Sequence, residues 1–410
     1  MYGNPLKVRV PSSAVLAVVV STFFLGFGGG VVFPILPDLG TIIGITPLVV
    51  GLILSVNRIV RLIANAPAGV LVDRIGTRKP FIAGVVLETA ATFGYVIAMY
   101  APTPAAWFFG TRVLWGLGSA FVLATAYTIA ANVSEHESRG STMGLVRGAT
   151  SLGFPAGMAL GGVVSEFYGT VIAFEAAAGL SVAATLIAIV AIPETHADHR
   201  SERASILDIN VTTSTLVIGG TNFGLLFTYS GVVFATLVSF LKTTDAAAVV
   251  VGPQGTYGVL IGTSVLIGSI CSIAGGKLSD TLSRRMPVIV SCLIVLALGV
   301  LVLASANTFL SLFLAMALLG VGQGGVGGPL LSLLGDQTNR EQLGRATGTY
   351  NVLGDLGAAV GLLVSPSVAE LIGFRSLYAV TVSVPLIAVG LILVYLLSER
   401  ESVQKGHLAE

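Results

Sequence analysis

The sequence predicts an all-α membrane protein with twelve transmembrane helices in two pseudo-symmetric six-helix halves. Three observations lead to this fold class. Of the 410 residues, 54% are hydrophobic and 10% are charged, whereas a soluble domain has about 25% charged residues. Apolar runs of transmembrane length recur along the whole chain. A charged motif around residue 73 also returns about half a chain length later.

Twelve apolar runs, separated by charges or by Gly and Pro turns, approach the roughly 20 residues that a transmembrane helix needs. They are expected at 13–36, 45–70, 80–100, 104–132, 142–166, 170–193, 212–241, 253–276, 286–305, 308–334, 346–369 and 375–397. The polar stretch THADHRSERASILDIN (195–210) divides them six and six. We therefore expect an N-terminal half at residues 1–194, a cytoplasmic central linker at 195–210 and a C-terminal half at 211–410.

The basic residues indicate how the helices are oriented. Sixteen of the 21 Lys and Arg residues fall in segments on the same side as the N-terminus, and only Lys242 and Arg375 fall in loops on the other side. Because cytoplasmic loops carry an excess of Lys and Arg, both termini are expected in the cytoplasm and the chain in the plasma membrane. The formal net charge of +1 argues against the basic face that nucleic-acid binding requires.

The two halves repeat one another in sequence. Residues 69–79 read GVLVDRIGTRK and residues 276–285 read GKLSDTLSRR, with Asp280 207 positions after Asp73. The fifth and eleventh runs also align, at a shift of 204 positions. Internal repeats of this kind are typical of secondary transporters.

These segments resemble the major facilitator superfamily, and the resemblance covers essentially the whole chain. GVLVDRIGTRK is similar to the family's signature between helices 2 and 3, and GKLSDTLSRR is similar to its degenerate copy between helices 8 and 9. RVLWGLG (112–118) is similar to the family's Arg-x-x-x-Gly-x-Gly motif, and FPILPD (33–38) resembles the twelve-helix, proton-coupled drug exporters. The resemblance implies the major facilitator fold and transport by alternating access.

The fifth run is rich in glycine. GFPAGMALGG (153–162) resembles the Gly-rich antiporter motif of the same family, except that Met158 stands where a proline is usual. Small residues on one helical face let helices pack closely in a bilayer. The resemblance implies that this face meets the opposite half. The residues concerned are Gly153, Gly157, Gly161 and Gly162.

The charged turn after the second run can act as a latch between helices. Asp73 lies at a helix terminus, where it can accept hydrogen bonds from exposed N–H groups of a neighbouring helix and pair with Arg74 or Arg78. The alternative is that the basic residues only anchor the topology. The second copy has Thr281 in place of the first basic residue and is expected to be weaker. The expected gating-loop residues are Gly69, Asp73, Arg74, Gly76, Arg78, Asp280 and Arg284.

Ionisable residues within the runs are strong candidates for a site, because each costs several kcal/mol in the membrane unless it is paired or hydrated. At about 1.5 Å per residue, Arg61 and Glu88 both lie about 12 Å from the inner boundary and can form an ion pair. Arg58 and Asp355 both lie about 15 to 16 Å deep. In the fold that the resemblance implies, the second and eleventh helices meet, so Arg58 and Asp355 can pair across the halves.

Uncharged polar residues and a further arginine complete the expected pathway for substrate and protons. Each Asn or Gln can equally form an interhelical hydrogen bond. The expected pathway residues are Asn57, Arg58, Arg61, Arg112, Asp355, Asn351, Asn222 and Gln323. Three arginines against two carboxylates make an anionic or neutral solute at least as well suited as a cation.

The residues and the resemblance together predict a monomeric secondary active transporter that carries out proton-coupled efflux (antiport) of a small organic solute and is similar to multidrug exporters. The alternative is an uptake symporter or a facilitator for an anionic or neutral metabolite such as an organic acid or sugar. No G-x-x-x-x-G-K-[ST] loop is present, so ATP is not expected as the energy source. No cofactor, metal or enzymatic activity is expected. A channel is the less favoured alternative, because it would need a symmetric ring of pore residues and the chain has a twofold repeat.

Overall fold

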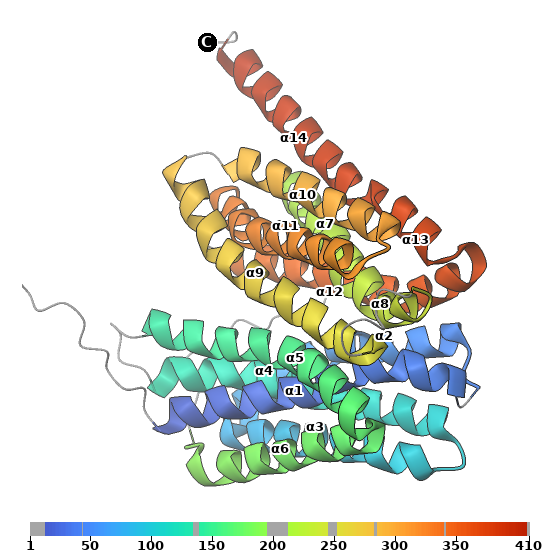
Figure 1. Ribbon diagram of the computed structural model, residues 1–410. Helices are drawn as coiled ribbons and strands as arrows, with labels where there is room; N and C mark the ends of the chain where they lie inside the picture. Colours follow the sequence, from blue (N-terminus) through green and yellow to red (C-terminus); the bar gives the residue numbers. More distant parts are fainter. Residues whose placement is uncertain are drawn as a thin grey trace, which may run out of the picture.

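The computed structural model describes residues 13–42, 44–133, 139–194, 212–244, 252–282, 285–339 and 342–407 of the chain, and these residues are mostly helical. Figure 1 shows the helices in two groups that follow each other along the chain. The first group consists of α1 (Ser13–Ile42), α2 (Pro47–Ile75), α3 (Arg78–Tyr100), α4 (Pro104–Val133), α5 (Arg139–Tyr168) and α6 (Thr170–Ala191).

The second group also makes six passes, although some of them are interrupted. α7 (Thr213–Leu226), the π-helical segment η1 (Phe227–Val233) and α8 (Phe234–Lys242) form one continuous pass. The remaining helices are α9 (Pro253–Thr281), α10 (Arg285–Ser305), α11 (Phe309–Asp336), α12 (Leu343–Ile372), α13 (Phe374–Thr381) and α14 (Ser383–His407). The last two form the twelfth pass, so the predicted fold class of twelve helices in two halves is confirmed.

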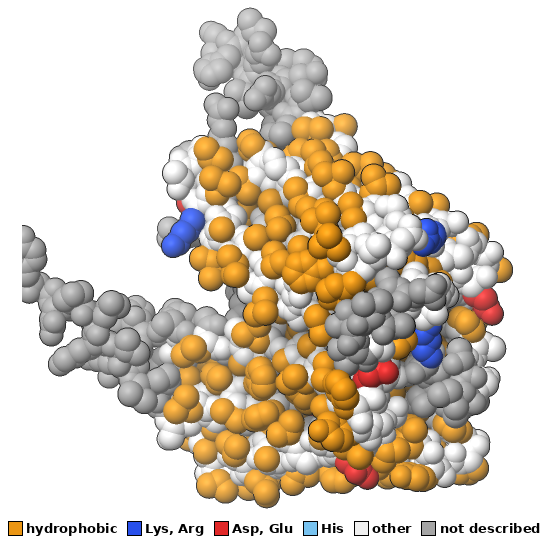
Figure 2. Space-filling view, in the orientation of Figure 1, with side chains coloured by type: hydrophobic (Ala, Val, Ile, Leu, Met, Phe, Trp, Pro, Cys, Tyr) orange, Lys and Arg blue, Asp and Glu red, His pale blue; other side chains and the backbone are white. Residues whose placement is uncertain are grey.

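The outside of the molecule is apolar, as a membrane-spanning protein requires. In the part of the chain that the structure describes, eleven passes are long and apolar enough to cross a membrane, and α5 is the remaining long helix. Figure 2 shows hydrophobic side chains over most of the visible face, with only a few charged groups among them. Leucines such as Leu310 (75% exposed) and Leu371 (83% exposed) point away from the protein, where lipid can cover them.

The charged motif after the second run differs from the expected loop. The run was expected to end at residue 70, but α2 continues to Ile75, so Asp73 and Arg74 belong to its last helical turn. Gly76 ends the helix with φ 83°, a left-handed conformation that glycine adopts without strain. α3 then begins at Arg78, and the connection is only two residues long.

Two ends of the bundle can be defined from the connections. The Gly76 end carries the α2–α3 connection, and the Gly169 end carries the α5–α6 connection. Near the Gly169 end, α2 packs against α12 and α5 packs against α9, which joins the two halves. Toward the Gly76 end the two groups diverge, at the left of Figure 1.

Candidate functional site

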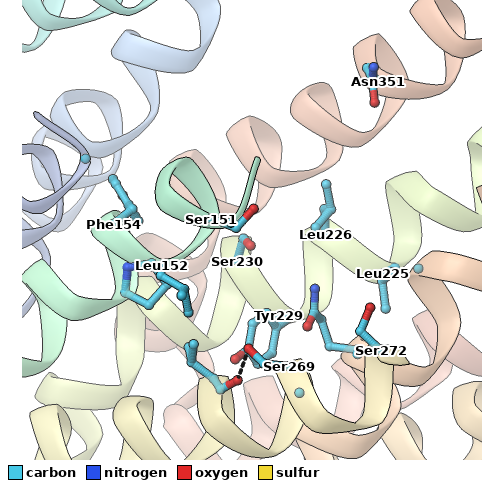
Figure 3. Close-up of a pocket in the computed structure, with 18 of the residues that line it drawn as sticks. Ser151, Leu152, Phe154, Leu225, Leu226, Tyr229, Ser230, Ser269, Ser272 and Asn351 are labelled. Atoms are coloured by element: carbon cyan, nitrogen blue, oxygen red, sulfur yellow. Dashed lines mark hydrogen bonds between the residues drawn. The ribbon is translucent and has the colours of Figure 1, made fainter. Parts of the chain in front are cut away.

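A cavity of about 1370 Å³ lies between the two halves. Its walls come from α1 to α5 on one side and from α7, η1, α8, α9, α11 and α12 on the other. Figure 3 shows part of this wall, with labelled side chains from α5, from the α7–η1 segment, from α9 and from α12. Seven residues that the sequence singled out line it, namely Asn57, Arg58, Arg61, Glu88, Asn222, Gln323 and Asn351.

An ion cluster at the border of the cavity links the two halves. Arg58 and Arg61, both on α2, donate to the same carboxylate oxygen, Oδ1 of Asp355 on α12, at N–O distances of 3.2 and 2.7 Å. The three side chains are only 16 to 21% exposed. Charge-assisted hydrogen bonds are about twice as strong as neutral ones. The predicted Arg58–Asp355 pair is present, and Arg61 adds a second charge-assisted bond to the same carboxylate.

Glu88 does not form the ion pair that the sequence predicted. Arg61 turns to Asp355, and no ion pair joins it to Glu88 among the residues that the structure describes. Glu88 is 2% exposed, lines the cavity, and has no hydrogen-bond partner for Oε2. Equal depth in two helices placed Arg61 and Glu88 at the same level, but the helices' rotation turns Arg61 toward α12. Glu88 is thus a carboxyl group at the cavity wall with one oxygen unpaired.

Arg112 lies in the interior of the N-terminal half and not on the cavity wall, which corrects the expectation that it belongs to the substrate pathway. It is fully buried. Its donors reach Gly29 O (3.3 Å) on α1, Leu54 O (3.4 Å) and Asn57 Oδ1 (2.7 Å) on α2, and Tyr95 OH (3.4 Å) on α3. One guanidinium on α4 therefore connects four helices of the same half.

Gly116 and Gly118, the glycines of the motif RVLWGLG (112–118), have a packing role. A side chain at Gly116 would collide with the backbone of Asn57 on α2, and one at Gly118 would collide with Glu88 on α3. Both collisions show that α4 packs at backbone distance against its neighbours, as small residues allow in membranes. The motif is therefore a packing unit that holds Asn57 and Glu88 at the cavity.

The C-terminal half contributes hydroxyl groups that sequence analysis missed. Tyr229 and Ser230, in the π-helical segment, line the cavity together with Ser269 and Ser272 of α9. All four are labelled in Figure 3. A π-helical turn often marks a functional position, but the sequence FTYSGVV gives no sign of it. Among the described residues that line the cavity, the charged side chains all belong to the N-terminal half.

The described parts of the gating loop make their contacts within one half. Arg78 donates from its backbone N–H to Glu194 (3.4 Å) and from its guanidinium to Ile189 O (3.0 Å), at the end of α6. In the second copy, Asp280 pairs with Arg285 at 2.8 Å, and Arg285 also binds Asp336 at the end of α11. The side chains of Asp73 and Arg284 lie outside the described residues. The latch between helices stays a prediction.

The glycine face of α5 turns out to have two different partners. Gly162 meets the backbone of Gln254 on α9, in the opposite half, as expected. Gly153, Gly157 and Gly161 instead face α1 in their own half. These three follow one another at intervals of four and so share one side of the helix, whereas Gly162 is turned about 100° away from Gly161. The interhalf assignment of the three glycines is therefore wrong.

Gly157→Ala is expected to destabilise the fold because the added methyl group would strike the backbone carbonyl of Phe27 on α1. Overpacking of this kind costs about 1 to 3 kcal/mol. The matched control is Gly148→Ala on the same helix, where a Cβ atom meets nothing within 4 Å. Thermal unfolding in detergent should show a lower midpoint for Gly157→Ala alone. Equal midpoints in the two variants would mean that α1 and α5 separate easily.

Comparisons with known proteins agree on one family. The family described as the Major Facilitator Superfamily matches residues 18–249 and 224–410. A protein named an uncharacterized MFS-type transporter, from Methanocaldococcus jannaschii, is 24% identical, covering 89% of this chain and 93% of the relative. A "multi-drug resistance efflux pump PmrA homolog" from Lactococcus lactis is 25% identical over 87% of this chain and 88% of its own.

A similarity in structure supports the same fold. The crystal structure of the nucleoside transporter NupG superposes with a TM-score of 0.78, at 13% sequence identity, and covers 93% of this chain and 99% of its own.

Proposed function

The chain belongs to the major facilitator superfamily, a family of membrane transporters, and on that premise we propose that it exports a small organic solute in exchange for protons. The observation that carries this proposal is the ion cluster between α2 and α12. It borders a cavity large enough for a drug-sized molecule. Because it joins the two halves, its protonation and the separation of the halves are linked equilibria.

The alternating-access cycle follows from which end of the cavity is closed. The halves touch near the Gly169 end and diverge at the Gly76 end. With both termini in the cytoplasm, as the distribution of Lys and Arg supports, this is a state open to the cytoplasm. The two halves, residues 1–194 and 211–410 joined by the linker 195–210, then rock to open the other end.

Two carboxyl groups are available to carry the proton. Asp355 is bound by two guanidinium groups in this state and becomes free when α2 and α12 separate. Glu88 is buried in the cavity lining and has an unpaired oxygen. Either group can link proton movement to the conformational change.

The direction of transport is supported by the resemblance of FPILPD and of the glycine-rich segment of α5 to exporters, and by the relative whose name is multi-drug resistance efflux pump. The protein works as a monomer in the plasma membrane. The second candidate function is uptake or facilitated movement of an anionic solute. Arg58 and Arg61 line the cavity and share one carboxylate, that of Asp355. This arrangement favours the second candidate, because the carboxylate of an anionic solute can compete with Asp355 for the two guanidinium groups.

The proposal is tested in inside-out membrane vesicles that hold an acidic lumen. A panel of cationic, neutral and anionic drug-like compounds is added, and both solute uptake and the internal pH are followed. For an exported solute we expect uptake accompanied by loss of protons from the lumen, and no accumulation once an ionophore has dissipated the pH gradient. Solute uptake that does not depend on the pH gradient would indicate a facilitator. Movement of protons in the same direction as the solute would indicate a symporter.

A further inference from the structure

The closed Gly169 end is held by close packing between α5 and α9. A Cβ atom at Gly162 would strike the backbone of Gln254, and one at Gly258 would strike the backbone of Ala159. The two helices therefore touch through their backbones near this end. Such contacts are short-ranged and carry no charge, so packing alone does not make the closure responsive to any signal.

A carboxylate adds charge to this closure. Glu166, in the last turn of α5, accepts hydrogen bonds through Oε2 from the backbone N–H groups of Gln254 (2.9 Å) and Gly255 (3.2 Å). These are among the first residues of α9, which begins at Pro253. The first N–H groups of a helix lack partners within the helix, and this end of the helix dipole is positive. A side chain of one half thus caps a helix of the other half.

Gly252 makes room for this contact. Its φ of 83° is the left-handed region that favours glycine, and a Cβ atom there would overlap the carboxylate of Glu166. The residue before α9 is therefore shaped to admit the carboxylate. Both the backbone conformation and the missing side chain at Gly252 serve one contact between the halves.

The contact lies where a proton can reach it. Glu166 is exposed, and it borders a small hollow of about 210 Å³ at the Gly169 end. Among the described residues that line this hollow, Lys242 at the end of α8 is the other charged side chain, and the facing residues of α6 and α9 are neutral. An ammonium keeps its charge as the solution becomes acidic, so an acid response at this place belongs to the carboxylate.

We propose that Glu166 is a positioning residue of the transport cycle, which holds the Gly169 end closed by its carboxylate and releases it on protonation. The proposal rests on the proposed alternating-access function. Protonation removes the negative charge at the N-terminus of α9 and weakens both hydrogen bonds. In the proposed orientation this end faces the outside, so external acid, which supplies the driving protons, also favours the state that receives them.

The experiment measures the opening of the Gly169 end directly and needs no transported solute. Spin labels are placed on Tyr100→Cys and Leu310→Cys, two exposed positions at that end of opposite halves, in a Cys271→Ser, Cys292→Ser background. Distance distributions are recorded by pulsed electron resonance in nanodiscs, at neutral pH and at about pH 4, where carboxylates take up protons. The label pair is combined with Glu166→Gln and, as a control, with Glu175→Gln. Glu175 is also an exposed carboxylate but belongs to α6.

In the parent protein, acid should raise the population of the long distance. Glu166→Gln should raise the ratio of open to closed by about tenfold already at neutral pH and should show a smaller further response to acid. Glu175→Gln should behave as the parent. Gly252→Ala, which blocks the carboxylate without removing it, should resemble Glu166→Gln.

An unchanged distribution in Glu166→Gln at neutral pH, or an acid response equal to that of the parent, overturns the proposal. Because no solute is involved, that outcome leaves the proposed export function standing. Failure of solute-driven proton release in vesicles would instead count against the export function alone.

Discussion

Arg112→Lys is expected to lower the thermal unfolding midpoint by several degrees and to remove most transport activity. The guanidinium binds acceptors on three neighbouring helices from within the core of the N-terminal half. An ammonium has three donors at a single nitrogen and cannot reach acceptors that lie in different directions. A hydrogen bond to a charged group contributes about 1.5 to 3 kcal/mol, so the loss of two or more of them is a large share of the stability of a typical domain.

The rings beside Arg112 add to the cost. Its guanidinium carbon lies 5.4 Å from the ring centre of Phe33 and 5.5 Å from that of Trp115. These are cation–π distances, and a planar guanidinium also stacks on such rings. The loss should appear in the folded yield and unfolding midpoint as well as in transport, since Arg112 joins four helices and does not itself line the cavity.

The control for Arg112→Lys is Arg375→Lys, an arginine at the Gly169 end that binds Ala306 O and Asn307. It lies near the surface, so its replacement should change the unfolding midpoint very little. Full stability combined with lost transport in Arg112→Lys would contradict the structural role and return Arg112 to the substrate pathway. Full stability with full transport would show that positive charge alone is enough at this place.

The fold could be predicted from sequence because each helix carries its own signal. Apolar length fixes the passes, and the repeated charged motif fixes the division into halves. The pair between Arg58 and Asp355 was also within reach, since depth along each helix follows from counting residues and the family resemblance implies that the second and eleventh helices meet. Helix rotation was not within reach. Arg61 and Glu88 lie at the same depth, but their side chains point in different directions. The spacing of Gly153, Gly157 and Gly161 shows that they share one side of α5, but it does not show which helix packs against that side.

Other parts of the site leave no trace in the sequence. Serines in a transmembrane helix often bond to carbonyls of their own helix, so Ser269 and Ser272 look like any other residues of an apolar run. The π-helical turn that presents Tyr229 and Ser230 depends on packing, as Gly231 touches Gly361 on α12. The hydroxyl-rich wall of the C-terminal half therefore emerges only from the structure.

Asp355→Asn is expected to abolish proton-driven accumulation while leaving solute exchange down its own gradient. An exchanger of one proton for one solute accumulates its solute about tenfold per unit of pH gradient, and the variant should fall to a ratio near one. The reason is that an amide cannot exchange a proton between the state bound by Arg58 and Arg61 and the state in which the halves have separated. Reconstituted vesicles with an imposed pH gradient measure the ratio.

Two further variants decide which carboxyl carries the proton. Glu88→Gln removes the carboxyl whose Oε2 has no partner, and Asp336→Asn is a control at the end of α11, where the acid pairs with Arg285. If Asp355 is the carrier, Glu88→Gln and Asp336→Asn keep gradient-driven accumulation. If Glu88→Gln alone loses it, Glu88 is the carrier and Asp355 is a fixed link between α2 and α12.

The remaining outcome separates coupling from structure. Asp355→Asn leaves two guanidinium groups at the α2–α12 contact without their carboxylate. If the pair is purely structural, the variant should lose folded protein, solute exchange and gradient-driven accumulation together. Asp355→Glu retains the charge and should keep both activities at least in part. The charge swap Arg58→Asp with Asp355→Arg cannot restore the contact, because the new arginine would face Arg61, which lies 2.7 Å from the present carboxylate. Recovery by that swap would show that Arg61 has no part in the link, and the two-arginine cluster would then reduce to the single pair.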